Sequence, residues 1–137
     1  MDNETRLLNC ALSLFSQNGY AGVGVQEVVD TAGVTKPTLY HYFGSKRGLL
    51  EALLSREATP LLDAIDQASD YQGDLTLTLE NMARSYFNFA KKSPEFYRMF
   101  LAMQYSPPES ETLEAFQPYL ERQKNIIERL FIKASES

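Results

Sequence analysis

The amino-acid sequence predicts an all-α protein of 137 residues. Apolar residues recur at helical spacing almost throughout, and the one β-branched run, at 23–29, also has helical spacing. Glycine and proline residues lie between these segments, at the positions where helices are expected to start and stop. Hydrophobic residues form 44% and charged residues 23% of the chain, the balance of a soluble globular protein rather than a disordered one.

Three short helices are expected in the N-terminal part. The first carries an apolar stripe between Leu8 and Phe15, and the second repeats that spacing between Val25 and Ala32. The third is capped by Thr35, because a threonine oxygen can accept from a free N–H of the first turn. The expected stop signals are Asn18-Gly19, Gly33 and Gly44, and Pro37 is tolerated in the first turn of the third helix.

Four longer segments follow. Ser45 caps a fourth helix that continues to Ala68 through Pro60, where a kink is expected. The sixth starts at Ser93-Pro94-Glu95 and stops at Ser106-Pro107-Pro108, and the last spans 113–131 with an interruption or bend at Pro118. The fifth is expected to bury a stripe of Leu75, Leu79, Met82, Ala83, Tyr86, Phe87 and Ala90, with Phe89 off that stripe.

The charge distribution is uneven along the chain. The net charge is −5, which taken alone argues against a nucleic-acid partner. Residues 31–50, however, contain no Asp or Glu and carry Lys36, His41, Lys46 and Arg47. Because screening limits charge effects to about 8–10 Å at physiological salt, the local sign governs contact with DNA. A basic segment followed by an acidic body is compatible with DNA binding.

The second and third helices, joined across Gly33, match a DNA-binding helix-turn-helix. If Leu39 and Phe43 of the third helix face inward, then Lys36, Thr38 and His41 face outward. Hydroxyls of tyrosine and amines of lysine are groups that bind DNA phosphates. Tyr40, Tyr42 and Lys46 are therefore expected to contact phosphates, although Tyr40 packing in the core and Pro37 merely stiffening the helix start are open alternatives.

The N-terminal motif resembles the signature of TetR-family (tetracycline-repressor-like) regulators. The resemblance covers roughly residues 6–55 and is most specific over Thr38-Leu39-Tyr40-His41-Tyr42-Phe43 with Ser45-Lys46. It implies a bacterial regulator that binds double-stranded DNA as a homodimer and holds a small-molecule effector in its C-terminal domain. It also implies DNA contacts by Thr35, Lys36, Pro37, Thr38, Tyr40, His41 and Lys46.

Three features depart from that family pattern. Gly24 stands where the family usually has Thr, so the second helix lacks a capping side chain. Gln26 replaces a position that is often basic and is expected to contact a base or to bind phosphate more weakly. The chain is also shorter than family members, so the helices used for dimerisation are expected to be missing or truncated. The expected organisation is a DNA-binding domain over 1–47 and an effector and dimerisation domain over 48–137.

The C-terminal part is rich in Phe, Tyr and Met. Helical spacing alone predicts that most of these side chains form an ordinary core. The density of aromatic residues also suggests a pocket for an apolar or aromatic ligand. The residues expected to line that pocket are Met82, Tyr86, Phe89, Phe100, Met103 and Phe116.

No catalytic, metal or cofactor site is predicted. The chain shows no catalytic nucleophile matched with a general base, and no glycine-rich phosphate loop after a strand. His41 is the only histidine, which argues against a metal site. Cys10 is expected to be a small buried hydrophobe rather than a redox sensor, and one cysteine with no signal peptide fits the cytoplasm. The competing hypothesis is a helical adaptor that no longer binds DNA and whose acidic body binds a basic protein.

Overall fold

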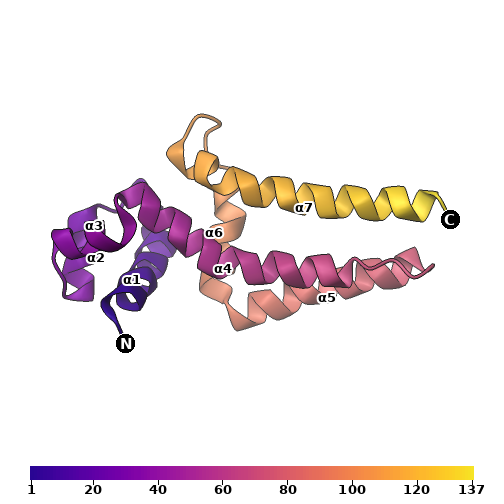
Figure 1. Ribbon diagram of the computed structural model, residues 1–137, viewed down its shortest axis with the longest axis horizontal. Coiled ribbons are helices and arrows are strands. Elements are labelled where there is room, and N and C mark those ends of the chain that lie inside the picture. The colour runs from indigo at the N-terminus through magenta and orange to yellow at the C-terminus, as the bar shows by residue number, and fades with distance from the viewer.

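The computed structural model describes all 137 residues and contains seven α-helices and no strand, which confirms the predicted fold class. Figure 1 shows an elongated molecule with the three short N-terminal helices gathered at one end and the long helices running toward the other. The helices are α1 (Asn3–Asn18), α2 (Val25–Ala32), α3 (Lys36–Phe43), α4 (Lys46–Ala68), α5 (Leu75–Lys92), α6 (Pro94–Met103) and α7 (Glu111–Ser135).

The boundaries of the N-terminal helices follow their local chemistry. The Asp2 carboxylate caps α1 by accepting from the Thr5 backbone N–H at 2.7 Å. Gly24 caps α2 without a side-chain bond, as expected from the missing threonine. Gly33 ends α2 in the left-handed conformation, with φ of 73°, which a residue with a Cβ adopts only with strain.

Prolines inside α4 and α7 do not interrupt either helix. The sequence predicts an interruption or a bend at Pro118, and the interruption does not occur, because α7 continues unbroken from Glu111 to Ser135. Proline removes one backbone donor and leaves the carbonyl four residues earlier without its partner. Pro60 and Pro118 are both exposed, so water can hydrate the freed carbonyls on the outer side of each helix.

The buried face of α5 differs from the predicted stripe. Leu79, Ala83 and Phe87 are exposed, Phe87 to 68%, and Phe89 is half-buried against the core. The true inner face passes through Thr78 and Met82, at a spacing of four residues. Thr78 can be buried because its hydroxyl donates to the Asp74 carbonyl at 2.9 Å. Because Thr78 is polar, the pattern of apolar residues in the sequence did not predict this face.

One continuous core joins the two ends of the molecule. Twenty-six buried apolar residues form a single cluster that extends from Leu7 in α1 to Leu130 in α7. The long helix α4 packs against α1 and α3 at one end and against α5 and α7 at the other. This helix therefore supports both the N-terminal helices and the C-terminal bundle.

Ion pairs join the outer edges of α4 and α7. Asp63 and Asp66 of α4 contact Arg122 at 2.7 Å and Arg129 at 3.3 Å, respectively. Exposed pairs of this kind contribute about 0.2–1 kcal/mol each, so they fix the register of the two helices more than they add stability.

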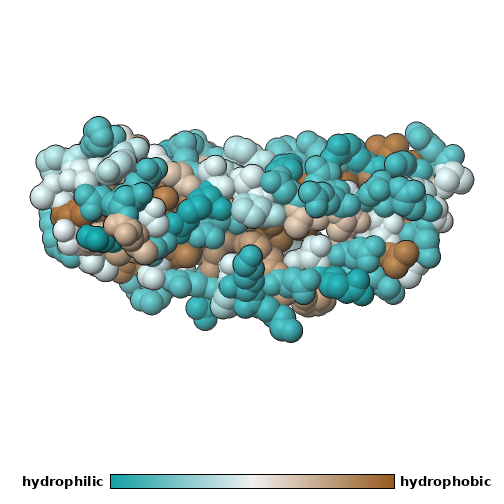
Figure 2. Space-filling model, turned by 60° about the horizontal axis from the view of Figure 1, so that its bottom comes forward, coloured by the Kyte–Doolittle hydropathy of each residue, from teal (hydrophilic) through white to brown (hydrophobic).

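The surface is mainly hydrophilic, with apolar side chains scattered among polar ones (Figure 2). Exposed apolar side chains include Leu77 and Phe87 on α5, Leu101 on α6, and Ile132 on α7. Phe131 of α7 is 47% exposed as well. None of the seven helices combines the length and the apolar composition that crossing a membrane requires.

Candidate nucleic-acid interface

The turn between α2 and α3 is built by Gly33 and the residue after it. The Gly33 N–H donates to the Asp30 carbonyl and the Val34 N–H donates to the Val29 carbonyl at 3.0 Å, which closes the end of α2. The chain then re-enters a helix at Lys36, with Pro37 in the first turn. Two short helices joined by a glycine turn are thus present where the sequence predicts a helix-turn-helix.

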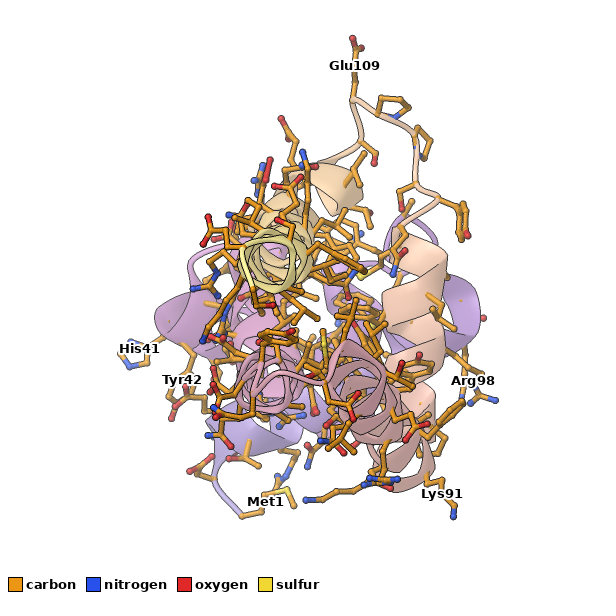
Figure 3. All side chains as sticks on the ribbon, turned by 90° about the vertical axis from the view of Figure 1, so that its right-hand side faces the viewer. Met1, His41, Tyr42, Lys91, Arg98 and Glu109 are labelled. Carbon is orange, nitrogen blue, oxygen red and sulfur yellow. The ribbon has the colours of Figure 1, made fainter.

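The third helix turns one narrow face inward and leaves most of its surface free. Leu39 is its only fully buried residue, and Phe43 packs against the core beside it. Figure 3 shows His41 and Tyr42 projecting away from the body of the protein. Thr38 is half-buried, and the other predicted interface residues of this segment are exposed: Thr35, Lys36, Pro37, Tyr40, His41 and Tyr42. Most of the side chains proposed to meet DNA are therefore accessible on α3 and at its N-cap.

Tyr40 had core packing as its alternative reading. Its side chain is 45% exposed, so the structure favours a residue available to a partner. Tyr42 is exposed to a similar extent, and its ring packs edge-on against His41 with the centroids 5.2 Å apart.

Two polar side chains on this surface are engaged with neighbours. The hydroxyls of Thr35 and Thr38 lie 3.0 Å apart. Thr35 occupies the N-cap position of α3, but its side chain does not make the expected hydrogen bond to a backbone N–H. Gln26 lies exposed on α2 and donates to the Asp30 carboxylate at 2.7 Å. Contact between a base and that N–H of Gln26 would require exchanging the bond.

The Lys46 side chain packs against Tyr20, although the sequence predicts that it contacts a DNA phosphate. Its Nζ donates to the backbone carbonyl of Tyr20 at 2.6 Å and sits 4.0 Å from the centre of the Tyr20 ring. Burial lowers the pKa of Lys46, and the nearby Glu111 carboxylate opposes that change. An ammonium has three N–H donors, so one bond to Tyr20 leaves others for a phosphate.

Arg47 connects this end of the molecule to α7, a contact that the sequence did not predict. Arg47 contacts Glu51 at 3.0 Å and Glu114 of α7 at 3.1 Å. Burial and the neighbouring Glu111 carboxylate raise the pKa of the Tyr20 hydroxyl. Arg47 and Glu114 lie 67 positions apart in the sequence, so only the fold reveals their contact.

The six residues predicted to line a ligand pocket mostly fill the core. Met82, Phe100, Met103 and Phe116 are buried, and the rings of Phe100 and Phe116 meet edge-to-face with centroids 5.0 Å apart. Tyr86 donates to the Gln123 side-chain carbonyl at 2.8 Å, and burial raises the pKa of Tyr86 to about 12. This arrangement is that of packed core side chains.

Two cavities touch members of that group separately. Met103 lines a cavity of about 420 Å³ between α1 and α6, together with residues of the α1–α2 turn. Phe89 lines another of about 400 Å³, beside Glu57 and Lys92. No group of three or more His, Cys, Asp or Glu side chains is arranged to hold a metal ion.

Comparison with known proteins identifies the N-terminal unit. Residues 7–53 match the sequence family described as bacterial regulatory proteins, tetR family. That segment contains most of α1, all of α2 and α3 and the start of α4, and it includes all nine residues predicted to contact DNA.

Two curated relatives extend the match beyond this segment. The transcriptional activator FasR of Mycolicibacterium smegmatis is 33% identical over 100 residues, which are 73% of this chain and 46% of FasR. The transcriptional repressor BdcR of Escherichia coli K12 is 37% identical over 83 residues, 58% of this chain and 42% of BdcR. The chain thus spans less than half the length of either relative.

A solved structure agrees in fold over almost the whole chain. A tetR-family transcription regulator from Shewanella sp. PV-4 superposes with a TM-score of 0.71 and 27% identity, covering 94% of this chain and 70% of its own. The similarity therefore includes the C-terminal helices as well as the helix-turn-helix.

Proposed function

This chain belongs to the TetR family of bacterial regulatory proteins, and from that membership we propose that it is a ligand-responsive transcription regulator acting on a pseudo-palindromic operator, most simply as a repressor. It is a DNA-binding regulator and not an enzyme. The observation that carries the proposal is the exposed side of α3, a helix that carries Lys36, His41 and the hydroxyls of Tyr40 and Tyr42 and contains no acidic residue. Cytoplasmic residence follows from a genomic DNA target.

The proposed contacts divide by chemistry. Lys36, Tyr40, Tyr42 and Lys46 bind phosphates and set the position of α3 on the duplex. Thr35, Thr38 and Gln26 reach base edges in the major groove, where each base pair shows a distinct pattern of donors and acceptors. His41 and Pro37 complete the surface beside them.

A dimer is required for this mode of binding. Two copies with their α3 helices about 34 Å apart would occupy successive major grooves on one face of B-DNA. We place the DNA-binding domain at 1–47 and the effector and dimerisation domain at 48–137. A bound effector would favour a state in which α4 shifts and the half-site spacing no longer fits. A coupling of about 1–3 kcal/mol suffices for release.

Lys36→Ala should weaken binding to every DNA sequence to a similar extent. Losing one phosphate contact reduces the slope of log K against log salt concentration by about 0.9 in magnitude. Binding is measured by fluorescence anisotropy at several salt concentrations, on a fragment selected by the protein from a random DNA pool.

Lys91→Ala is the matched control, because Lys91 is an exposed lysine on the opposite side of the molecule from His41 (Figure 3). Its slope should equal that of the parent chain. Identical slopes for all three proteins would contradict the phosphate role of Lys36, and failure to select any DNA would favour the adaptor hypothesis.

Thr38→Ala should change the preferred operator sequence rather than overall affinity for DNA. One base contact contributes about 1–3 kcal/mol of discrimination, so preference at one position of each half-site should relax. Selection from a random pool followed by sequencing measures this. Thr31→Ala is the control, since Thr31 is exposed on α2 and its hydroxyl donates a hydrogen bond to the Glu27 carbonyl. An unchanged binding profile for Thr38→Ala would rule out base contact by that residue.

A further inference from the structure

Asp30 is an exposed carboxylate in the last turn of α2. It takes part in none of the ion pairs of the structure. Its one side-chain partner is Gln26, one turn earlier on the same helix, whose Nε2 donates to the Asp30 carboxylate at 2.7 Å. A bond of this spacing supports a helix slightly, but the partial negative charge at a helix C-terminus opposes a carboxylate there. Helix stability therefore gives little reason for an acid at this position.

The bond fixes which end of the Gln26 amide is free. An ionised carboxylate only accepts hydrogen bonds, whereas the amide has two N–H donors on Nε2 and an accepting oxygen, Oε1. Turning the amide over would bring Oε1 against the carboxylate, and two acceptors repel each other. Nε2 is therefore held at Asp30, and Oε1 is left without a donor from the protein.

We propose that Asp30 is a positioning residue that determines base specificity through Gln26. This inference rests on the proposed function, in which Gln26 reaches a base edge in the major groove. With Oε1 free, Gln26 accepts a hydrogen bond from an exocyclic amino group, which is N6 of adenine or N4 of cytosine. The second N–H of Nε2 stays available for N7 when the base is adenine. Asp30 acts without touching the DNA.

Overall affinity for DNA does not isolate this role, because removing any carboxylate near DNA reduces repulsion of the phosphates. Glu27 supplies the matched control, since it is an exposed acid on the same helix and adjacent helical residues do not face each other. Asp30→Asn and Glu27→Gln each remove one negative charge. Only Asp30→Asn lets the Gln26 amide turn over, because an asparagine side chain both donates and accepts.

Operators that lack a single base group test the contact. Gln26→Ala identifies the base pair, as the position whose preference relaxes when the full chain selects sequences from a random DNA pool. The amino group of that pair is then removed, by purine in place of adenine or 2-pyrimidinone in place of cytosine. Affinity of the parent chain, measured by fluorescence anisotropy, should fall by about fivefold or more, because Oε1 loses its donor.

The variants should respond differently to that change in the operator. Removing the amino group should make little difference to Gln26→Ala, with or without Asp30→Asn. Its effect on Asp30→Asn alone should shrink toward that on Gln26→Ala, because the released amide can offer an N–H to an acceptor of the base pair instead. Its effect on Glu27→Gln should equal that on the parent chain.

The pairing of the two side chains is measured in the free protein. The NH₂ signals of Gln26 in a ¹⁵N NMR spectrum are assigned by their loss in Gln26→Ala, and they should shift in Asp30→Asn. The Tm of Asp30→Asn should stay close to that of the parent chain. A clear fall in Tm would instead assign Asp30 to the stability of α2.

An operator whose amino group does not matter to the parent chain, equal sensitivity of the parent and Asp30→Asn, or the same loss of sensitivity in Glu27→Gln would each overturn the specificity role. Unshifted Gln26 signals would overturn the pairing. All of these results require a parent chain that binds DNA or folds normally. Failure to select any DNA would refute the proposed function and the base contact with it, while the NMR signals would still decide whether Asp30 holds Gln26.

Discussion

Replacing Phe116 by alanine should lower the free energy of unfolding by about 3–5 kcal/mol, which is the range for removing a fully buried aromatic ring. Phe116 is 0% exposed, and its ring packs between those of Phe100 and Tyr119. Rigid helices surround it, so the space left by the ring cannot close completely. Urea unfolding followed by circular dichroism gives the change directly.

Phe87→Ala is the matched control for that substitution. Phe87 is 68% exposed on the outer side of α5, so its truncation should change stability by no more than about 0.5 kcal/mol. A cost near zero at Phe116 would mean that its ring lines an empty ligand pocket, as the sequence suggested, and does not support the core.

Gly48→Ala should destabilise the protein by about 1–3 kcal/mol, although alanine normally stabilises a helix interior relative to glycine. A Cβ at Gly48 would lie 1.9 Å from the backbone oxygen of Phe43. Backbone atoms cannot rotate away as a side chain can, so the junction between α3 and α4 must shift. DNA binding should weaken in parallel, because α3 carries the proposed contacts.

Gly24→Ala tests whether the effect comes from the close contact. Gly24 has a φ of −96°, which any residue adopts, and an added Cβ there meets no atom within 4 Å. The loss at Gly24 should be less than about 1 kcal/mol, since alanine is only a poorer N-cap. Thermal and urea unfolding of both variants provide the comparison. Equal stability of Gly48→Ala and the parent chain would contradict the contact.

The sequence was sufficient for the helices whose ends carry their own signals. Gly33 and Gly44 both have positive φ and end α2 and α3 where the sequence predicts. Such signals are local, so no tertiary information is needed to read them. The interruption at Pro118 was predicted because the sequence does not show that Pro118 lies on the solvent-exposed side of α7.

The surfaces of the helices were harder to predict than their ends. Apolar residues occupy two sides of α5, and only packing against α4 decides that Thr78 faces inward and Phe87 outward. The same limit applies to the ligand residues. Spacing places Phe100 and Phe116 on buried faces but cannot distinguish a filled core from the wall of a cavity.

Contacts across the junction could not be predicted at all. The bond from Lys46 to Tyr20 spans 26 positions, and that from Arg47 to Glu114 spans 67. No periodicity connects such residues, because their distance depends on how α1, α4 and α7 assemble. The exposed face of α3 was predictable for the opposite reason, since a short helix with one buried leucine has few ways to pack.

The single interior shared by both ends of the molecule has a consequence for genetics. Under the proposed function, substitutions that loosen the C-terminal bundle would lower the amount of folded protein and therefore the fraction of operator bound, even when α3 is unchanged. A screen for chains that no longer regulate should therefore recover defects across the whole gene, and many of them should be rescued by lower growth temperature.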